Sequence, residues 1–420
     1  MIEVIDFPKH WELRPAWSLF RRSKTTGFPD MELLSVYRDH GVVPKSSRDD
    51  NHNVASDDLN SYQLVQPGDL VVNKMKAWQG SFAISDFQGI VSPAYFVYKA
   101  RHEENSKFLH YLLRSSPYLA HYNRISSGVR IGQWDLDPAK FNVTGIGIPP
   151  RAEQDAIVEF LDRELVSIDQ LIEKQLKLIE AIKLRFQTLL DEFVTGGFRS
   201  NQMKPTSHPW LTEIPSNWTM GRLKLALRSP VTDGPHTTPV FEPEGFPFLS
   251  VDGIQDGELI FENCRYVSES DFVEFSKKAR PELGDILMGK AASVGKIARV
   301  KTSKAFAIWS PLALLKIDKT KFDSSFIEFY LKSTFVQSQI QAISNANTQQ
   351  NLGMNQIPNL ILVYPHQKEQ VEIGNAISAQ LAIGQQTISK AVEVVDHLRE
   401  RRQALISSAV TGKITTQRAE

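Results

Sequence analysis

Two long stretches of the chain carry apolar residues at a seven-residue spacing. From residue 153 to 194 neither Gly nor Pro interrupts the pattern, which begins after Pro149-Pro150 and ends at Gly196-Gly197. Pro before the first turn and Gly after the last are the usual start and stop signals of a helix. A second apolar position within each heptad is typical of a coiled-coil seam. The pattern therefore predicts a helix of about 40 residues, roughly 60 Å long.

The second stretch has the same seam. Its small residues Gly384 and Ala391 would let a partner helix approach closely. An antiparallel pair within one chain would cover both seams and place the flanking domains at opposite ends. The alternative is that each helix packs on its own domain. We assign the seams to Leu165, Ile172, Ile179 and Phe186 in the first helix, and to Leu381, Ile388, Val395 and Leu398 in the second.

An internal duplication with an offset of 216 residues extends over the chain. The segment that starts at Ile148 aligns without a gap on the one that starts at Tyr364. Because this period is far too long for a solenoid, each copy is a module of one globular domain followed by one long helix. The clearest matches are Glu153-Gln154 with Glu369-Gln370, Val194-Thr195-Gly196 with Val410-Thr411-Gly412, and Gly68-Asp69-Leu70 with Gly284-Asp285-Ile286.

The parts outside the helices are predicted to be mixed α+β domains. Short apolar runs at 70–72, 95–98, 285–288 and 312–315, bounded by Gly or Pro turns, predict strands, and helices are expected from Ser106 to Ser115 and from Ser324 to Ser333. We therefore expect an α+β fold with pseudo-twofold symmetry and two antiparallel long helices. The expected segments are a globular domain at 1–147, a spacer helix at 148–198, a second domain at 199–363 and a second spacer helix at 364–420.

Composition narrows the classes of function. The 48 Lys and Arg balance the 48 Asp and Glu, which excludes a strongly basic protein but leaves room for a local basic face. The first long helix is acidic and the two domains are slightly basic. The one cysteine, Cys264, can form neither an internal disulfide nor a Cys-rich metal cluster. With no leader-like start and no long apolar run, we expect a cytoplasmic protein without membrane contact.

Motifs of several enzyme classes are missing. The chain has no Asp/Glu-x-Lys of a metal-dependent nuclease and no Pro-Pro-aromatic loop of a DNA amino-methyltransferase. The segment 289–297 resembles a phosphate-binding P-loop, but it has one residue too many between the glycines and Ile where Mg²⁺ needs Ser or Thr. We interpret it as a basic loop between two strands. His236 has no second ligand at a useful spacing, so we expect no metal site.

Basic and amide side chains gather in three loops of each domain. Arg and Lys pair with guanine or phosphate, and Asn and Gln pair with adenine. One such loop is unremarkable on a surface, but three at equivalent positions of two copies favour recognition of nucleic acid. The candidate contacts are Arg21, Arg22, Lys24, Lys74, Lys76, Trp78, Arg130 and Gln133 in the first copy, and His236, Thr237, Lys290, Lys296, Asn347, Gln349 and Gln350 in the second.

Taken together, these motifs resemble the specificity (S) subunits of type I restriction-modification systems. The resemblance rests on the Pro-Glu-Gln start of each long helix, the Val-Thr-Gly at its end, the opening from Ile214 to Trp218 and the loop Asp233-Gly234-Pro235-His236. It extends over essentially the whole chain. It implies that each domain is a target recognition domain that reads one half of a bipartite, asymmetric DNA sequence, and that the paired helices set the gap.

The resemblance also implies a division of labour among subunits. Two methyltransferase (M) subunits would dock on the helices, and motor-nuclease (R) subunits would join for cleavage of double-stranded DNA. The S subunit is not catalytic and would bind no cofactor itself, because S-adenosylmethionine, ATP and Mg²⁺ belong to the partners. The competing class is a protein-interaction scaffold with two heads on a coiled coil and no DNA contact. Neutral net charge favours that scaffold, whereas the duplicated basic loops oppose it.

Overall fold

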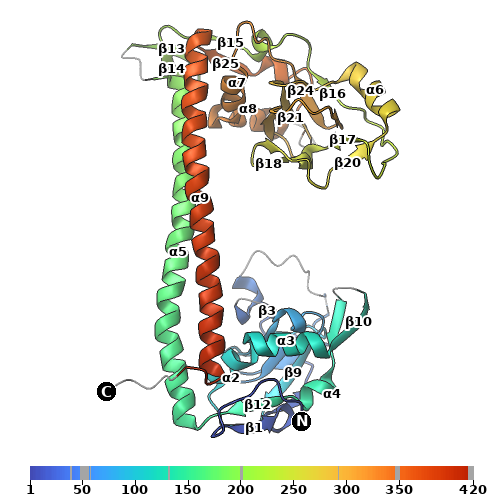
Figure 1. The fold of residues 1–420 in the computed structure, drawn as a ribbon, viewed down its shortest axis with the longest axis vertical. Coiled ribbons are helices and arrows are strands. Elements are labelled where there is room, and N and C mark those ends of the chain that lie inside the picture. Colours follow the sequence, from blue (N-terminus) through green and yellow to red (C-terminus); the bar gives the residue numbers. More distant parts are fainter. Residues whose placement is uncertain are drawn as a thin grey trace. The chain divides into compact units, whose positions relative to one another are not determined.

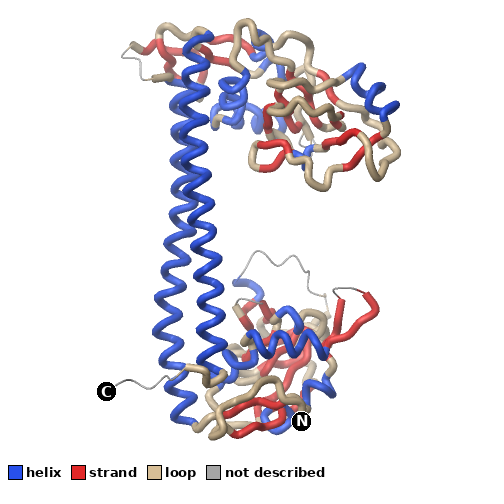
Figure 2. The backbone as a smooth tube through the Cα atoms, in the orientation of Figure 1, coloured by secondary structure: helices blue, strands red, loops and turns tan. Residues whose placement is uncertain are grey.

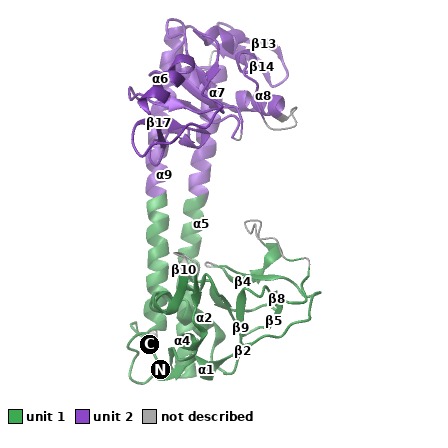
Figure 3. Cartoon of the chain, turned by 90° about the vertical axis from the view of Figure 1, so that its right-hand side faces the viewer, with its two compact units in different colours: residues 1–176, 392–420 green, residues 177–391 purple. Residues whose placement is uncertain are grey.

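The computed structural model of the chain describes residues 1–37, 40–47, 56, 58–130, 133–198, 202–291, 293–345 and 351–414. They form two compact units (Figure 3). Unit 1 combines Met1–Leu176 with Val392–Glu420, and unit 2 is Lys177–Ala391. Each unit contains one globular copy and a part of both long helices, and each mixes helix with strand. The predicted α+β class is therefore confirmed.

The long helices are α5 (Arg151–Gly196) and α9 (Gln367–Val410) (Figures 1 and 2). In unit 1, Asp169 of α5 accepts a hydrogen bond from the Arg402 guanidinium of α9 at 2.9 Å. Near the start of α5, Trp11 contacts both Glu153 and the segment just after the end of α9. The two helices therefore run antiparallel in this unit, as the heptads predict.

Unit 2 repeats the antiparallel pairing with the other halves of the helices. An added Cβ on Gly384 of α9 would lie 3.7 Å from the Cγ2 of Ile182 of α5, and Gly197, directly after α5, lies against Glu369 near the start of α9. The distance of 3.7 Å is ordinary van der Waals contact, so Gly384 is not needed for the close approach that we expected there. The seam residues of both helices, Leu165 to Phe186 and Leu381 to Leu398, are buried or half-buried.

Each long helix packs on both globular copies, one at each of its ends. In unit 1, Leu161 and Leu165 of α5 join the same apolar core as Ile406 and Ala409 of α9. Unit 2 shows the reverse, with the end of α5 and the start of α9 in one core. The two helices therefore pair antiparallel, as we expected, and each also packs on the globular copy that precedes it in the chain, which was the alternative.

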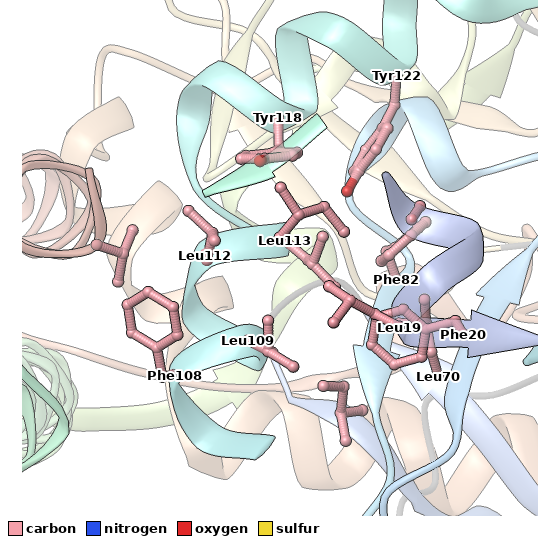
Figure 4. Packing of buried hydrophobic residues seen from close by; sticks show 14 of the residues in the cluster. Leu19, Phe20, Leu70, Phe82, Phe108, Leu109, Leu112, Leu113, Tyr118 and Tyr122 are labelled. Atoms are coloured by element: carbon pink, nitrogen blue, oxygen red, sulfur yellow. The ribbon is translucent and has the colours of Figure 1, made fainter. Parts of the chain in front are cut away.

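The sheet of unit 1 is four-stranded, in the order β2 (Phe20–Ser23), β9 (Tyr95–Ala100), β6 (Leu70–Asn73) and β7 (Phe82–Ile84), all antiparallel. Helices α2 (Ser106–Leu113) and α3 (Ser116–Ile125) supply apolar side chains to the core that contains this sheet (Figure 4). Large side chains in that core are fully buried, and the burial of each stabilises the fold by roughly 1.5–3 kcal/mol. The remaining elements are α1 (Ala16–Leu19), α4 (Pro138–Asn142), η1 (Lys45–Ser47), η2 (Ala77–Gln79), and the pairs β1 (Glu12–Pro15) with β12 (Gly145–Ile148), β3 (Leu34–Tyr37) with β4 (Gly41–Pro44), β5 (Gln63–Val65) with β8 (Gly89–Val91), and β10 (Ser126–Arg130) with β11 (Gln133–Leu136).

Unit 2 contains the matching sheet, in the order β16 (Thr232–Asp233), β24 (Leu312–Leu315), β21 (Ile286–Gly289) and β22 (Ile297–Arg299). It adds a three-stranded sheet, in the order β20 (Arg265–Val267), β17 (Phe246–Leu249) and β23 (Ala307–Ile308). The predicted strands and both predicted helices occur in the two units within a few residues of their expected bounds. The remaining elements are α6 (Glu269–Lys278), α7 (Ser324–Lys332), α8 (Thr334–Asn345), η3 (Leu223–Ala226), η4 (Val251–Gly253), η5 (Ile357–Asn359), and the pairs β13 (Met203–His208) with β14 (Leu211–Pro215), β15 (Thr219–Arg222) with β25 (Ile361–Tyr364), and β18 (Ile254–Gln255) with β19 (Glu258–Leu259).

The repeated Glu-Gln motif at the start of one long helix and a glycine directly after the other form a junction in each unit. In unit 2, the indole Nε1 of Trp218 donates to Glu369 Oε1 at 3.1 Å, and Gly197 lies against that ring with φ of 63°, a conformation that favours glycine. Unit 1 has the same contact between Trp11 and Glu153, also at 3.1 Å. The motifs therefore join a globular copy to the start of one long helix and the end of the other.

No helix among the described residues is long and apolar enough to span a membrane.

Candidate nucleic-acid interface

Candidate contacts of the first copy gather around Phe96 on β9. The guanidinium of Arg22, on edge strand β2, lies 4.2 Å from the centroid of the Phe96 ring, and the ammonium of Lys74, directly after β6, lies 4.9 Å from it. Lys24 is close enough to act on Lys74 electrostatically. Cations are attracted to the face of an aromatic ring, so the Phe96 ring holds the side chains of Arg22 and Lys74 in place. We call Arg22, Lys24, Lys74 and Phe96 the Phe96 cluster.

Positive charge is concentrated in the Phe96 cluster. Burial lowers the pKa of Lys74, the charges of Arg22 and Lys24 lower it further, and Asp135 on β11 acts in the opposite direction. Among the described residues, neither Arg22 nor Lys74 forms an ion pair with a carboxylate. The cluster therefore presents cations whose charge neighbouring acids neutralise only in part, which is what a phosphate-binding surface requires.

The other candidates of the first copy have different positions. Arg21 neighbours Arg22 on β2, so its side chain points to the opposite face of the sheet. The ring centroid of Trp78 in η2 lies 5.2 Å from that of Trp134 of β11, with the two rings tilted by 50°. The sequence analysis did not single out Trp134. Lys76, two residues before Trp78, is exposed. Arg130 ends β10 and pairs through the backbone with Gln133 of β11. Strand β11 lies beside η2, which holds Trp78.

In the second copy a buried carboxylate gathers the cations. Asp233, in β16, has a side chain only 6% exposed and lies 2.5 Å from the ammonium of Lys278, 3.1 Å from that of Lys290 and 3.1 Å from Nε2 of His236. Burial raises the pKa of Asp233, but hydrogen bonds and charges from Lys278 and Lys290 lower it by more, so the carboxyl stays ionised. We call Asp233, His236, Lys278 and Lys290 the Asp233 cluster.

Backbone contacts fix the loops around Asp233. Gly234 has no room for a side chain, because an added Cβ would lie 1.9 Å from the carbonyl oxygen of Ile308. The backbone nitrogen of Lys290 donates to the carbonyl oxygen of Pro311 at 3.0 Å, and its own carbonyl oxygen accepts from Leu352 at 2.8 Å. The loop that resembled a P-loop joins β21 to β22, as we interpreted it. Three separate segments therefore meet at this cluster.

The remaining candidates of the second copy are exposed or undescribed. His236 has a side chain 67% exposed, so only one of its edges faces Asp233. Thr237 and Lys296 are exposed. Asn347, Gln349 and Gln350 lie outside the described residues. Sequence reasoning named Asp233 only as part of the loop that carries the family resemblance and gave no role to Lys278 or Phe96, since Lys278 and Lys290 are distant from Asp233 in the chain and only the fold brings them together.

Within the part of the chain that the structure describes, no group of three His, Cys, Asp or Glu side chains is placed to hold a metal ion.

Comparison with known proteins places both copies in one family. A family model described as the type I restriction modification DNA specificity domain matches residues 22–181 and 238–394. The EcoKI specificity subunit of Escherichia coli K12 is 24% identical over 346 residues, which are 80% of this chain and 70% of that protein. The EcoBI specificity subunit of Escherichia coli is 24% identical over 330 residues, 75% of this chain and 67% of that protein.

A solved structure has the same fold. It was solved in work on the structural basis of complex assembly and conformational transition of the type I R-M system, and its matching chain has a TM-score of 0.70. The match covers 98% of this chain and 100% of that chain at 16% identity, so the likeness concerns the fold.

Proposed function

Since the chain belongs to the family of type I restriction-modification DNA specificity subunits, we propose that each globular copy reads one half of a bipartite DNA target. The observation that carries this proposal is the cluster of basic side chains in each copy, the Phe96 cluster in the first and the Asp233 cluster, with Lys278 and the exposed His236, in the second. Phosphate contacts would set the register of each copy on the duplex while neighbouring side chains read base edges. Because the two copies are joined in one molecule, binding of one half-site raises the effective concentration of the other copy at the second half-site, so the two short half-sites are bound together with higher affinity.

The paired helices would set the gap between the two half-sites and bind the partner subunits. Exposed apolar side chains recur at equivalent positions of the two helices, Leu176 with Val392 and Leu178 with Val394. Equivalent exposed positions are what two copies of one partner protein need, and exposed apolar residues are typical of such contacts. We propose two methyltransferase subunits as these partners, with R subunits joining for cleavage. The methyl donor S-adenosylmethionine, ATP and Mg²⁺ would be bound by the partners, in the cytoplasm.

A methylome tests the proposal. Cells that express this chain with its methyltransferase are compared with cells in which only this gene is deleted, and N6-methyladenine is mapped on genomic DNA. We expect a bipartite motif with a fixed unspecified gap that disappears with the gene. A methyltransferase that is present and active but marks the same sites without this chain would contradict the proposal and favour an interaction scaffold.

A further inference from the structure

Lys74 and Lys290 occupy the same place in the two copies. Each follows an inner strand of the four-stranded sheet, β6 or β21, and the 216-residue offset of the duplication relates them. The side chain of Lys290 is 11% exposed, and Lys74 is half-buried. The charged side chains around the two lysines nevertheless differ in sign.

Strand register locates the difference. Phe96 and Ala313 are equivalent, because they pair with the matching residues Val72 of β6 and Met288 of β21. Asp233 pairs with Ala313. The register of β2 on β9, extended by one residue, places Lys24 opposite Phe96. Lys24 and Asp233 are therefore equivalent positions, and they carry opposite charges.

The two lysines consequently have different neighbours. In the first copy, Lys74 shares the Phe96 ring with Arg22 and has Lys24 nearby, while Asp135 acts on it in the opposite direction. The Lys74 ammonium donates a hydrogen bond to the neutral carbonyl oxygen of Pro93 at 2.5 Å. In the second copy, Lys290 lies 3.1 Å from the buried carboxylate of Asp233. An ammonium that already has a buried counter-ion gains little from a phosphate, whereas an ammonium among cations gains most.

Resting on the proposed DNA-binding function, we infer that the residue at this equivalent position decides the role of the repeated lysine. Lys74, beside Lys24, binds a DNA backbone phosphate. Lys290, held by Asp233, is a positioning residue that fixes the loops of the Asp233 cluster and takes no phosphate. The two copies therefore hold DNA by different means: the first depends more on charge, and the second more on a pre-ordered loop that presents His236.

Salt dependence separates the two roles, because each phosphate contact contributes about 0.9 to the slope of log K against log salt. The full chain, co-expressed with its methyltransferase subunits, is titrated with a duplex that carries the methylated motif, over a range of KCl concentrations. The variants are K74Q, K290Q and the double variant D233N/K290Q, which removes both buried charges together and so avoids an unpaired carboxylate. Thermal unfolding of each variant checks that it is folded.

We expect K74Q to reduce the slope by about 0.9. We expect D233N/K290Q to leave the slope unchanged while it lowers discrimination against a base change in the second half-site by about 10-fold. A slope reduced by the double variant as much as by K74Q, or unaffected by K74Q, would overturn the inference. A wild-type complex that does not distinguish the motif from a scrambled duplex would instead overturn the proposed function, so the two failures are distinguishable.

Discussion

At the scale of single residues, Glu328 of α7 shows how unit 2 keeps a charge in its interior. Its side chain is fully buried, and its two oxygens accept hydrogen bonds from Arg299 at 2.9 Å and from Lys332 at 2.6 Å. Burial raises the pKa of Glu328, but the charge of Lys332 and the bond from Arg299 lower it by more. Removing one member of such a buried ion pair destabilises the fold strongly, because it leaves the remaining charge in the interior without a partner.

Glu328→Gln should lower the free energy of unfolding by about 3 kcal/mol, because it leaves Arg299 and Lys332 without their carboxylate. The matched control is Glu282→Gln, which removes a half-exposed partner of Arg228 and Lys316 and should cost less than about 1 kcal/mol. Urea unfolding of the full chain at neutral pH measures both. Equal losses of unfolding free energy in the two variants would show that the burial of Glu328 does not determine how much its ion pairs stabilise the fold.

The same residue makes a prediction about pH. The folded pKa of Glu328 lies below its ordinary value of 4.5, so its contribution is complete above 4.5 and is lost as the pH falls through the folded pKa. We expect the stability difference between wild type and E328Q to shrink on acidification below 4.5. Thermal unfolding against pH measures it, and a difference that stays constant would mean that Glu328 is not the titrating group.

Residues of this kind mark where sequence reasoning stops. The matching helices α2 and α7 begin at Ser106 and Ser324, which aligns Glu328 with His110 of the first copy, so the repeat does not predict an acid at this buried position. Asp233 and Lys278 are likewise distant in the chain and share no periodic pattern. Candidate cations could be chosen from their loops, but which of them a carboxylate neutralises depends on strand register, which the sequence pattern does not determine.

At the scale of elements, periodicity was a sufficient guide to the helices. The heptads predicted the seams of α5 and α9 and their antiparallel pairing, because a seam must be covered and the second helix supplies a matching one. The spacing of small residues was a poorer guide, since Gly384 has room to spare while Gly374 does not. An added Cβ on Gly374 would lie 3.0 Å from Asp323 Oδ1 and 3.2 Å from Ser325 Cβ.

This contrast predicts opposite results for the same substitution in one helix. Gly384→Ala should stabilise the chain by about 1 kcal/mol, because Ala has the higher helix propensity and its Cβ finds only an ordinary contact with Ile182. Gly374→Ala should lose that gain to the crowding against α7. Thermal unfolding of both variants measures the difference, and a Gly384→Ala variant less stable than wild type would mean that the helices are packed more closely there.

At the scale of the whole molecule, the proposed spacing role makes a prediction about DNA. One heptad inserted into α5 between Leu178 and Ile179, and another into α9 between Thr387 and Ile388, keeps both seams in register. Each insertion adds about 10 Å of helix, equal to roughly 3 base pairs. We expect a methylated motif with unchanged half-sites and a gap longer by about 3 base pairs.

The control for that prediction is an insertion in one helix alone, which puts the two seams out of register and should abolish specific methylation. Sequencing for N6-methyladenine measures both variants. A change in the half-site bases after the paired insertion would show that the helices do more than separate the two copies.

The way unit 1 is composed has a consequence for synthesis on the ribosome. Unit 2 is one continuous stretch, so all of its residues have been translated once Ala391 is added. Unit 1 needs Ile406, Ala409 and Gly412 against residues of the first copy, so its core stays open until these residues have emerged. The copy translated first is therefore the one completed last, and the nascent first domain must wait, with apolar surface exposed, for the end of α9.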